Sequence, residues 1–371
     1  MRVLVLNAGS STLKASVLDG DNRDPLFATT LEWGADASRA EGRAADFEAL
    51  LEHLVVEGIP VGSIEAIGHR VVHGGTQFTA PALIDDEVLD ELDGLAELAP
   101  LHNPVAVETI RAALVALPGV PAAAAFDTAF HATLPPAAFL YPLPDAWVTA
   151  HGLRRFGFHG LSVEWATARS AELLGAPAAD LGLVVAHLGS GCSVTAVDGG
   201  RSAWTSMGMT PLEGLMMGTR SGSVDPGILV RLLHAGVTPD ELDEGLERES
   251  GLLGVAGSAD MRELLDRVGA GDSDAELAVE LFAQSAAQGI AAAATALPRL
   301  DGLVFTGGIG EYAGLVRARI VGRLGVLGLF GQLADAETDA VLTARGAGPA
   351  VLRVEAREDL VIAEATRRLL D

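Results

Sequence analysis

A pattern of two strands joined by a glycine-serine turn occurs twice in the chain, about half a chain length apart. Near the N-terminus VLVLN is followed by AGSS and LKASVLD, and in the second half LVVAH is followed by LGSG and SVTAVDGG. A shift of 180 residues (189 − 9) lays Gly9 on Gly189 and Ser16 on Ala196. A strand–turn–strand unit that returns in this way predicts two domains of the same topology, whose turns can each offer backbone N–H groups to an anion.

The length and composition of the chain agree with two globular domains. At 371 residues it is long for a single core, and its 49% apolar and 20% charged residues are ordinary globular values. The formal charge of −25 argues against nucleic acid or an anionic membrane as a partner. The apolar run 275–297 carries a glutamate or glutamine at every fourth position from Glu276 to Gln288, which predicts a packed helix and no membrane span.

The N-terminus and the single cysteine indicate a cytoplasmic location. The opening segment MRVLVLNAGSS has one arginine and an apolar run too short for a signal peptide. Cys192 is the only cysteine, so no intrachain disulfide can form, and a reducing compartment fits.

The remaining pattern alternates strands and helices and is typical of an α/β protein with mixed sheets. Asn103 is expected to cap a helix that has Pro104 at its first position, and the acidic, alanine-rich segment 36–46 is expected to be a solvated loop. Beyond the two hairpins we expect strands at 27–31, 64–72, 122–126, 303–306 and 351–354, and helices at 46–57, 103–117, 162–174, 226–235, 239–249, 259–268, 274–297, 313–324 and 358–370.

Three glycine-rich turns are candidates for binding phosphate, because each directly follows a strand expected to be buried. They are NAGSST at 7–12, HLGSG at 187–191 and TGGIGE at 306–311, and none has the GxxxxGK[ST] pattern of a P-loop. Lys14, the only lysine among 25 basic residues, lies beside the first turn, where a lysine is a common phosphate ligand. A genome rich in arginine codons explains the general scarcity of lysine, but not the position of this one.

Two arginines lie in glycine-rich surroundings where a solvated side chain would be unusual. Arg70 occurs in GHRVVHGG and Arg220 in MMGTRSGSVDP. A planar guanidinium binds a carboxylate or phosphate with two parallel hydrogen bonds, which favours anion recognition at both positions. A structural ion pair is the alternative for either arginine.

The histidines and two carboxylates complete the set of candidate residues. Asp127 follows an apolar strand and Glu358 begins the last helix, where an acidic residue also favours the helix dipole. Four histidines lie at strand ends or turns without the spacing of a zinc site, and we expect at least one to be structural: His102, His131, His159 and His187.

The order and spacing of these motifs resemble the acetate kinase family over nearly the whole chain. The matching segments are NAGSSTLK, HRVVHGG, LAPLHNP, FDTAFH, FGFHG, HLGSG, TSMGMTPLEGLMMGTRSG and TGGIGE. The resemblance implies reversible, direct in-line transfer of the ATP γ-phosphoryl group to acetate, giving acetyl phosphate and ADP, with Mg²⁺ as the cofactor and Mn²⁺ as an alternative metal. It also implies a cytoplasmic homodimer with small-molecule substrates.

The fold implied by the resemblance is that of the actin-like ATPases. Two duplicated ribonuclease H-like domains with mixed sheets flank a nucleotide cleft in this superfamily. Residues 1–129 with 359–371 would form the N-terminal domain, and residues 130–358 would form the domain that binds the nucleotide and the second subunit.

The resemblance assigns a role to each matching residue. The catalytic residues would be Arg70, Asp127, His159 and Arg220. The nucleotide and its phosphates would contact three groups of residues: Asn7, Ser10, Thr12 and Lys14; His187, Gly189, Ser190 and Gly191; and Gly307, Gly308, Ile309 and Gly310. Acetate would be held by Arg70 and an apolar pocket of Val72, Leu101, Phe158 and Pro211. The metal would lie near Asn7 and Glu358.

Three positions depart from the family pattern. Ser190 and Tyr312 each stand where the family has asparagine, and Thr12 stands where it usually has serine. The first two lie on the nucleotide side, so a pyrophosphate-linked enzyme is one alternative. A kinase for propionate or another short-chain acid is a second, because a pocket discriminates weakly against one extra methylene. A non-catalytic actin-like nucleotide-binding protein is a third, although the candidate charged residues are intact.

Overall fold

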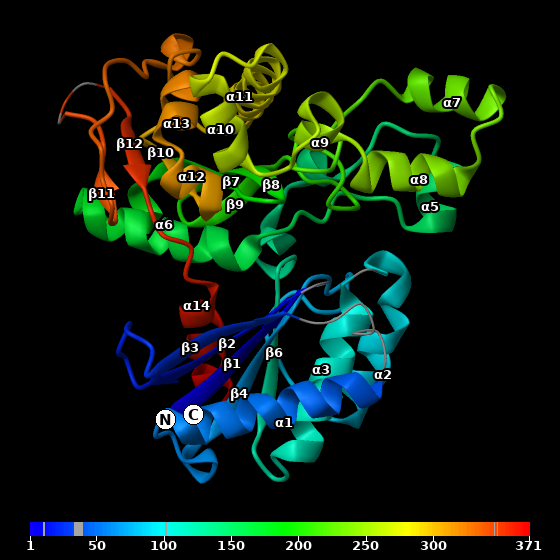
Figure 1. Ribbon diagram of the computed structural model, residues 1–371, viewed down its shortest axis with the longest axis vertical. Helices are drawn as coiled ribbons and strands as arrows, with labels where there is room; N and C mark the ends of the chain where they lie inside the picture. The colour runs from blue at the N-terminus through cyan, green and yellow to red at the C-terminus, as the bar shows by residue number, and fades with distance from the viewer. Residues whose placement is uncertain (10–11, 33–39, 101, 345, 347) are drawn as a thin grey trace. The chain divides into compact units, whose positions relative to one another are not determined.

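The computed structural model describes residues 1–9, 12–32, 40–100, 102–344, 346 and 348–371 (Figure 1). The chain divides into two compact units. The first comprises Met1–Ala132, His159–Leu161 and Arg357–Asp371, and the second comprises Thr133–Phe158 and Ser162–Ala356. The chain therefore passes from the second unit back to the first twice, at the Phe158–His159 and Ala356–Arg357 peptide bonds.

Each unit contains a six-stranded mixed sheet, and the two sheets have the same strand order. In both, three antiparallel strands come first, and two parallel strands join the other side of the first strand. The first sheet, in the order β3-β2-β1-β4-β6-β5, contains β1 (Arg2–Ala8), β2 (Thr12–Asp19), β3 (Phe27–Glu32), β4 (Ala66–Val71), β5 (Ala82–Leu83) and β6 (Ala122–Phe126). The second, in the order β11-β12-β10-β7-β8-β9, contains β7 (Gly182–Leu188), β8 (Cys192–Asp198), β9 (Arg201–Thr205), β10 (Gly302–Thr306), β11 (Ala340–Val341) and β12 (Ala350–Arg353). The duplication predicted from the two hairpins is confirmed.

The register of the two hairpins corrects one detail of that alignment. Val5 pairs with Ser16 in the first hairpin, and Val185 pairs with Thr195 in the second. Ser16 therefore corresponds to Thr195, a shift of 179 (195 − 16), and not to Ala196. The turn of the second hairpin is one residue shorter than that of the first, so a single shift cannot align both strands.

Helices cover both faces of the first sheet. α1 (Ala40–Val56) and α3 (Asn103–Ala116) pack together and share a core with β1, and α14 (Glu358–Leu370) packs on β1, β4 and β6 (Figure 1). Gly68 in β4 allows this close approach, because a Cβ there would lie 2.6 Å from Cγ2 of Ile362. The bounds predicted for the last helix, 358–370, are confirmed.

Of the remaining helices, all except α6 and α11 are shorter than α14. They are α2 (Asp86–Gly94), α4 (Pro136–Phe139), α5 (Asp145–His151), α6 (Gly160–Leu174), α7 (Pro226–His234), α8 (Pro239–Arg248), α9 (Gly251–Ala256), α10 (Met261–Gly269), α11 (Ser273–Ala294), α12 (Gly307–Tyr312) and α13 (Gly314–Val321). Among the described helices α11 is the one long and apolar enough to cross a membrane, but it packs on β7, β8 and α13 as a core helix. Its buried face includes Ala278, Phe282 and Ala286.

Two expectations about the first unit are wrong. Of the loop expected over residues 36–46, residues 36–39 lie outside the described part of the chain. Residues 40–46 form the first turns of α1, because alanine is the strongest helix former and outweighs the charge of this segment. Asn103 does not cap α3. Its side chain instead accepts a hydrogen bond from the backbone N–H of His73 at 3.1 Å and donates to the His73 carbonyl at 2.9 Å. The Asn103 side chain thus bonds the backbone of His73, 30 residues away, instead of the first turn of α3.

His69, in β4, is a buried histidine that is expected to limit stability in acid. Its side chain is 1% exposed, and its Nε2 has no hydrogen-bond partner among the described residues. Burial lowers its pKa from 6.5 to about 3. Between these values the unfolded chain binds a proton that the folded chain does not, so stability falls as the pH is lowered. At pH 5 this group alone should cost about 2 kcal/mol.

A His69→Leu variant should therefore lose less stability between pH 7 and pH 5 than the parent protein, by about 2 kcal/mol in urea unfolding. His53 provides the control, because it is an exposed histidine of α1. Equal pH dependence in the parent and in His69→Leu would contradict the argument.

Candidate active site

Three polar side chains meet where neighbouring strands of the first sheet end. Arg70 lies in β4, Asn7 in β1, and Asp127 directly follows β6. Arg70 binds Asp127 with both arms of its guanidinium, Nε to Oδ1 at 2.8 Å and Nη2 to Oδ2 at 2.5 Å. Its Nη1 donates to Oδ1 of Asn7 at 3.0 Å. Because β1, β4 and β6 are parallel, these groups gather at the carboxyl edge of the sheet, the usual place for ligand sites in α/β folds.

Glu358 adds a second carboxylate to this cluster. Its Oε2 accepts a hydrogen bond from Nδ2 of Asn7 at 2.9 Å and lies 3.7 Å from Nε of Arg70. Burial raises the pKa of Glu358, the charge of Arg70 opposes the rise, and the neighbouring charge of Asp127 adds to it. Lys14, opposite Asn7 in the hairpin, also lowers the pKa of Glu358 through its charge. Burial lowers the pKa of Arg70, but Asp127 and Glu358 together raise it above its ordinary value, so Arg70 stays charged.

The carboxylates of this cluster suit a magnesium ion shared with phosphate. Among the described residues no group of three or more His, Cys, Asp or Glu side chains could hold a metal alone. Mg²⁺ is commonly bound by one or two carboxylates, with water and substrate phosphates completing its octahedron. Glu358 has a raised pKa, which means that its ionised form is under-stabilised by the protein and would be favoured by a cation. The oxygen donors therefore fit Mg²⁺ when the nucleotide is present.

His159 is held beside Asp127 in an unusual backbone conformation. Its φ of +59° makes it the one non-glycine residue with positive φ in the described part of the chain. The next residue, Gly160, donates its N–H to the Asp127 carbonyl at 2.9 Å, and a Cβ at Gly160 would lie 2.1 Å from that oxygen. Left-handed conformations cost about 1–3 kcal/mol in a residue with a side chain and cluster at functional sites.

The second unit brings two of the three glycine-rich segments together, although residues 307–311 form the start of helix α12 and not the turn expected from the sequence. They follow β7 and β10, which are neighbouring parallel strands with Thr306 paired to His187. Gly307 has a φ of +76°, and a Cβ there would lie 2.8 Å from the Leu188 carbonyl and 3.1 Å from Nε2 of His187. A Cβ at Gly189 would lie 4.0 Å from the Gly308 nitrogen. The absence of side chains is thus what allows the two turns to touch.

Arg220 lies in a loop attached to the same region of the second unit. Its Nε pairs with Oε2 of Glu247 in α8 at 2.8 Å. In that loop the N–H of Gly218 donates to the Ser190 carbonyl at 3.4 Å. Burial raises the pKa of Cys192, next to the second turn, to about 12, and the charge of Arg220 is among the influences that lower it. The loop that carries Arg220 therefore contacts this turn through Gly218 and Ser190.

The remaining candidate residues are distributed over both units. In the first, Thr12 is half-buried and its carbonyl accepts from the N–H of Gly9 at 2.7 Å, while Val72 is buried just after β4. In the second, Phe158 is buried and Pro211 is half-buried. Ser10 and Leu101 lie outside the described residues.

Sequence analysis missed the cluster that fixes the loop before Arg220. The Tyr141 hydroxyl donates to a Glu213 oxygen, and Arg155 binds the other oxygen of Glu213 at 2.6 Å. Arg155 also donates to the carbonyls of Ser206 and Met207. A charged residue inside the apolar run MTPLEGLMM was the available signal, because Glu213 there needs a cationic partner. Ser162 was missed as well, and its Oγ lies 2.8 Å from Nδ1 of His187.

Comparison with known proteins gives consistent matches over the full chain. The family model described as the acetokinase family matches residues 2–364. An acetate kinase from Deinococcus deserti is 46% identical and covers 100% of this chain and 98% of its own.

Two solved structures resemble the whole chain. The crystal structure of Porphyromonas gingivalis acetate kinase has a TM-score of 0.88 at 33% identity and covers 100% of both chains. A propionate kinase from Francisella tularensis has a TM-score of 0.89 at 36% identity and covers 99% of both chains.

Proposed function

This chain belongs to the acetokinase family, and from that premise we propose which of its residues perform the reaction. The activity is that of an acetate kinase, a phosphotransferase that moves the γ-phosphoryl group of ATP to the carboxylate of acetate, and the reverse. Its two duplicated units have the actin-like ATPase fold. We propose that residues 1–129 with 359–371 and residues 130–358 are its two functional domains.

The observation that carries the assignment is the fixed guanidinium of Arg70, called the fork below, which Asp127 binds with two parallel hydrogen bonds. Both reactants are anions, so catalysis has to come from positioning and from neutralising charge on the transferred group. Asp127 and Asn7 together engage Nε, Nη1 and Nη2 of Arg70 and hold the plane of the guanidinium fixed. Arg70 would hold the acetate carboxylate, Asp127 would orient it, and His159 would donate a hydrogen bond to the transferring phosphoryl group. Val72, Leu101, Phe158 and Pro211 would surround the methyl group.

The residues of the nucleotide side bind phosphate in this proposal. The turns at 187–191 and 307–310 offer backbone N–H groups, which suit phosphate oxygens. Asn7, Ser10, Thr12 and Lys14 would provide the first-unit contacts, and Arg220 would neutralise charge on the transferring phosphoryl group. Direct in-line transfer needs no covalent intermediate on the protein, so the carboxylates and His159 act in this proposal by hydrogen bonding and charge.

Mg²⁺ is the metal we propose, near Asn7 and Glu358, with Mn²⁺ able to replace it. When bound, the ion neutralises charge on the nucleotide phosphates. Glu358 supplies a carboxylate with a raised pKa, and Asn7 holds it in place through Nδ2.

A substrate panel tests the proposed chemistry. Acetyl phosphate formed from acetate should be trapped with hydroxylamine, with ATP, GTP and pyrophosphate compared as donors and acetate and propionate as acceptors. We expect ATP with acetate to be the best pair. Propionate should be turned over within about 10–100-fold of acetate, because one methylene is worth about 1–3 kcal/mol. Pyrophosphate as the best donor would favour the alternative suggested by Ser190 and Tyr312.

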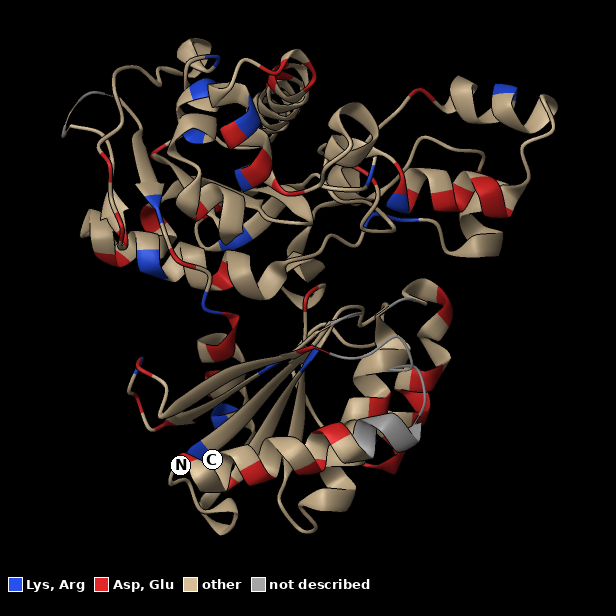
Figure 2. Ribbon diagram, viewed as in Figure 1, with Lys and Arg blue, Asp and Glu red and all other residues tan. Residues whose placement is uncertain are grey.

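We also propose a cytoplasmic homodimer, for which α7 offers a suitable face. None of its residues is buried, and its sequence PGILVRLLH has no acidic residue in a chain with a charge of −25. Ile228 and Leu232, which are four residues apart and therefore lie on one face of the helix, are 48% and 37% exposed. The acidic residues of the second unit lie on other elements such as α8, whereas α7 is almost uncharged (Figure 2). An exposed apolar helix of this kind is typical of a subunit interface.

Replacing Ile228 and Leu232 together with aspartate should convert dimers to monomers. Burying each side chain is worth roughly 1.5–3 kcal/mol, so the dissociation constant should rise by about 10²-fold or more in sedimentation velocity. Val115→Asp is the matched control, because Val115 is exposed on α3 of the other unit. A double variant that remains dimeric would exclude α7 as the interface.

A further inference from the structure

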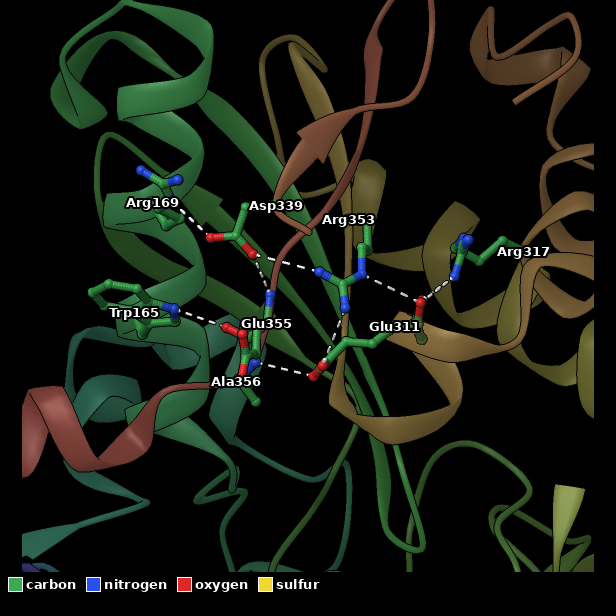
Figure 3. Close-up of polar contacts among 9 residues, drawn as sticks. Trp165, Arg169, Glu311, Arg317, Asp339, Arg353, Glu355 and Ala356 are labelled. Atoms are coloured by element: carbon green, nitrogen blue, oxygen red, sulfur yellow. Dashed lines mark hydrogen bonds and ion pairs between the residues drawn. The ribbon is translucent and has the colours of Figure 1, made fainter. Parts of the chain in front are cut away.

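A buried carboxylate in the second unit links the nucleotide turn to the segment that leads into Glu358. Glu311 ends the TGGIGE motif and is 6% exposed. Its Oε1 accepts the backbone N–H of Ala356 at 3.0 Å, and its Oε2 lies 3.9 Å from Nη2 of Arg353 (Figure 3). Burial raises the pKa of Glu311, while the N–H of Ala356, the charge of Arg353 and the backbone of Gly307 lower it. The same side chain thus interacts with the first glycine of the turn and with the end of the second unit.

Two buried arginines fix the other end of the turn. α12 is one short helix, so its last carbonyls have no partner within it. Arg317 donates from Nη1 to the carbonyls of Gly310 and Glu311 at 2.9 and 2.7 Å, and Arg353 donates from Nε to the Glu311 carbonyl at 3.4 Å. Arg317 and Arg353 are 3% and 2% exposed. The Arg353 guanidinium also lies 5.5 Å from the ring of Tyr312, which gives this departure from the family pattern a structural partner.

The segment that follows β12 is held from three sides. Glu355 donates its N–H to Oδ1 of Asp339 at 2.8 Å and accepts Nε1–H of Trp165 at 2.8 Å. Ala356 is held by Glu311, and Figure 3 shows these residues converging from α6, α12 and the strand β12. Glu358 follows Ala356 by two residues, a reach of at most about 7 Å.

We propose that Glu311 is a positioning residue that couples nucleotide binding at the 307–310 turn to the placement of Glu358. A nucleotide that orders the turn orders Glu311, and Glu311 fixes the chain immediately before the metal-associated carboxylate. The inference rests on the proposed metal role of Glu358 and adds a second residue to it. It concerns no step of the chemistry, so its signature is in binding.

The test is the coupling between ADP and Mg²⁺, measured by isothermal titration calorimetry. The quantity is the ratio of the ADP dissociation constant in EDTA to that in saturating Mg²⁺. Glu311→Ala should lower this ratio about tenfold, because the two sites then lose their link. Glu311→Asp keeps the charge but withdraws the carboxylate from Ala356, so it should lower the ratio about fivefold. This variant tests the coupling if the alanine variant does not fold. Glu311→Gln keeps an oxygen acceptor for the Ala356 N–H and should retain the ratio within about threefold.

A merely structural role for Glu311 predicts a different outcome. It would weaken ADP binding equally with and without Mg²⁺ and leave the ratio unchanged, and that result in the aspartate or alanine variant would overturn the inference. Glu172→Gln is the matched control, because Glu172 is an acidic residue of the same unit that pairs with Arg169 at 2.6 Å on the exposed surface. Glu358→Gln separates the two proposals. If the Glu358→Gln variant keeps the full ratio, the proposed metal role of Glu358 is wrong, and the inference about Glu311 is wrong as well. If it lowers the ratio while the Glu311 variants do not, the inference alone is wrong.

Discussion

An Arg70→Ala variant is expected to lose about 10³-fold or more of kcat for acetyl phosphate formation. Fixed arginines that neutralise a transferring phosphoryl group are worth about 10³–10⁵ in rate in other phosphotransferases. Arg70 meets the structural requirement, because Asp127 and Asn7 hold its plane and its side chain is 17% exposed. The rate should be measured at saturating acetate and ATP, so that a loss of kcat is separated from a loss of acetate binding.

The alanine change also removes the cation between two carboxylates. Asp127 is 1% exposed, and leaving it unpaired should destabilise the first unit by about 3–5 kcal/mol. Arg70→Lys avoids most of this cost and keeps the charge but not the fork, so it should stay folded and still lose about 10²-fold in kcat. Arg111→Lys is the control, since Arg111 pairs with Asp93 and Glu108 on an exposed surface of the same unit. A lysine variant within threefold of the parent would contradict the role of the fork.

Much of the fold was predictable because its signals are local. The two hairpins are defined by neighbouring residues, and their duplication was enough to predict two units of like topology. The last helix was predictable because it begins with an acidic residue, Glu358, which the helix dipole favours. The loop predicted at residues 40–46 was wrong because the prediction relied on the charge of the segment, whereas its alanine content favours a helix.

The parts that could not be predicted depend on partners distant in sequence. Asn103 is a good helix cap by type, but His73 engages its side chain. Asp127 was placed near the site, yet its bidentate pairing with Arg70 requires β4 and β6 to be neighbours. Glu311 was recognised only as the end of a turn, since its contact with Ala356 spans 45 residues. In each case the residue type indicated a polar role, but its partner is determined by which strands and helices are neighbours in the fold.

Replacing His159 with asparagine is expected to lower kcat by about 10²–10³-fold with little change in melting temperature. Loss of one preorganised donor to a developing negative charge typically costs this much. Asparagine is the informative substitute because it tolerates the left-handed conformation better than most residues, so the φ of +59° can be kept. His159→Ala would confound the result, because alanine retains the backbone strain and loses every side-chain contact.

Glycine at position 159 completes the argument by separating strain from chemistry. Glycine adopts positive φ without a steric penalty, so His159→Gly should be more stable than His159→Ala by about 1 kcal/mol while being equally impaired in kcat. This combination of results would mean that the enzyme maintains a strained backbone at position 159 in order to position the imidazole for catalysis. An asparagine variant with a kcat within threefold of the parent would show instead that the strain serves the Gly160–Asp127 contact alone, and that the donor to the phosphoryl group is another residue.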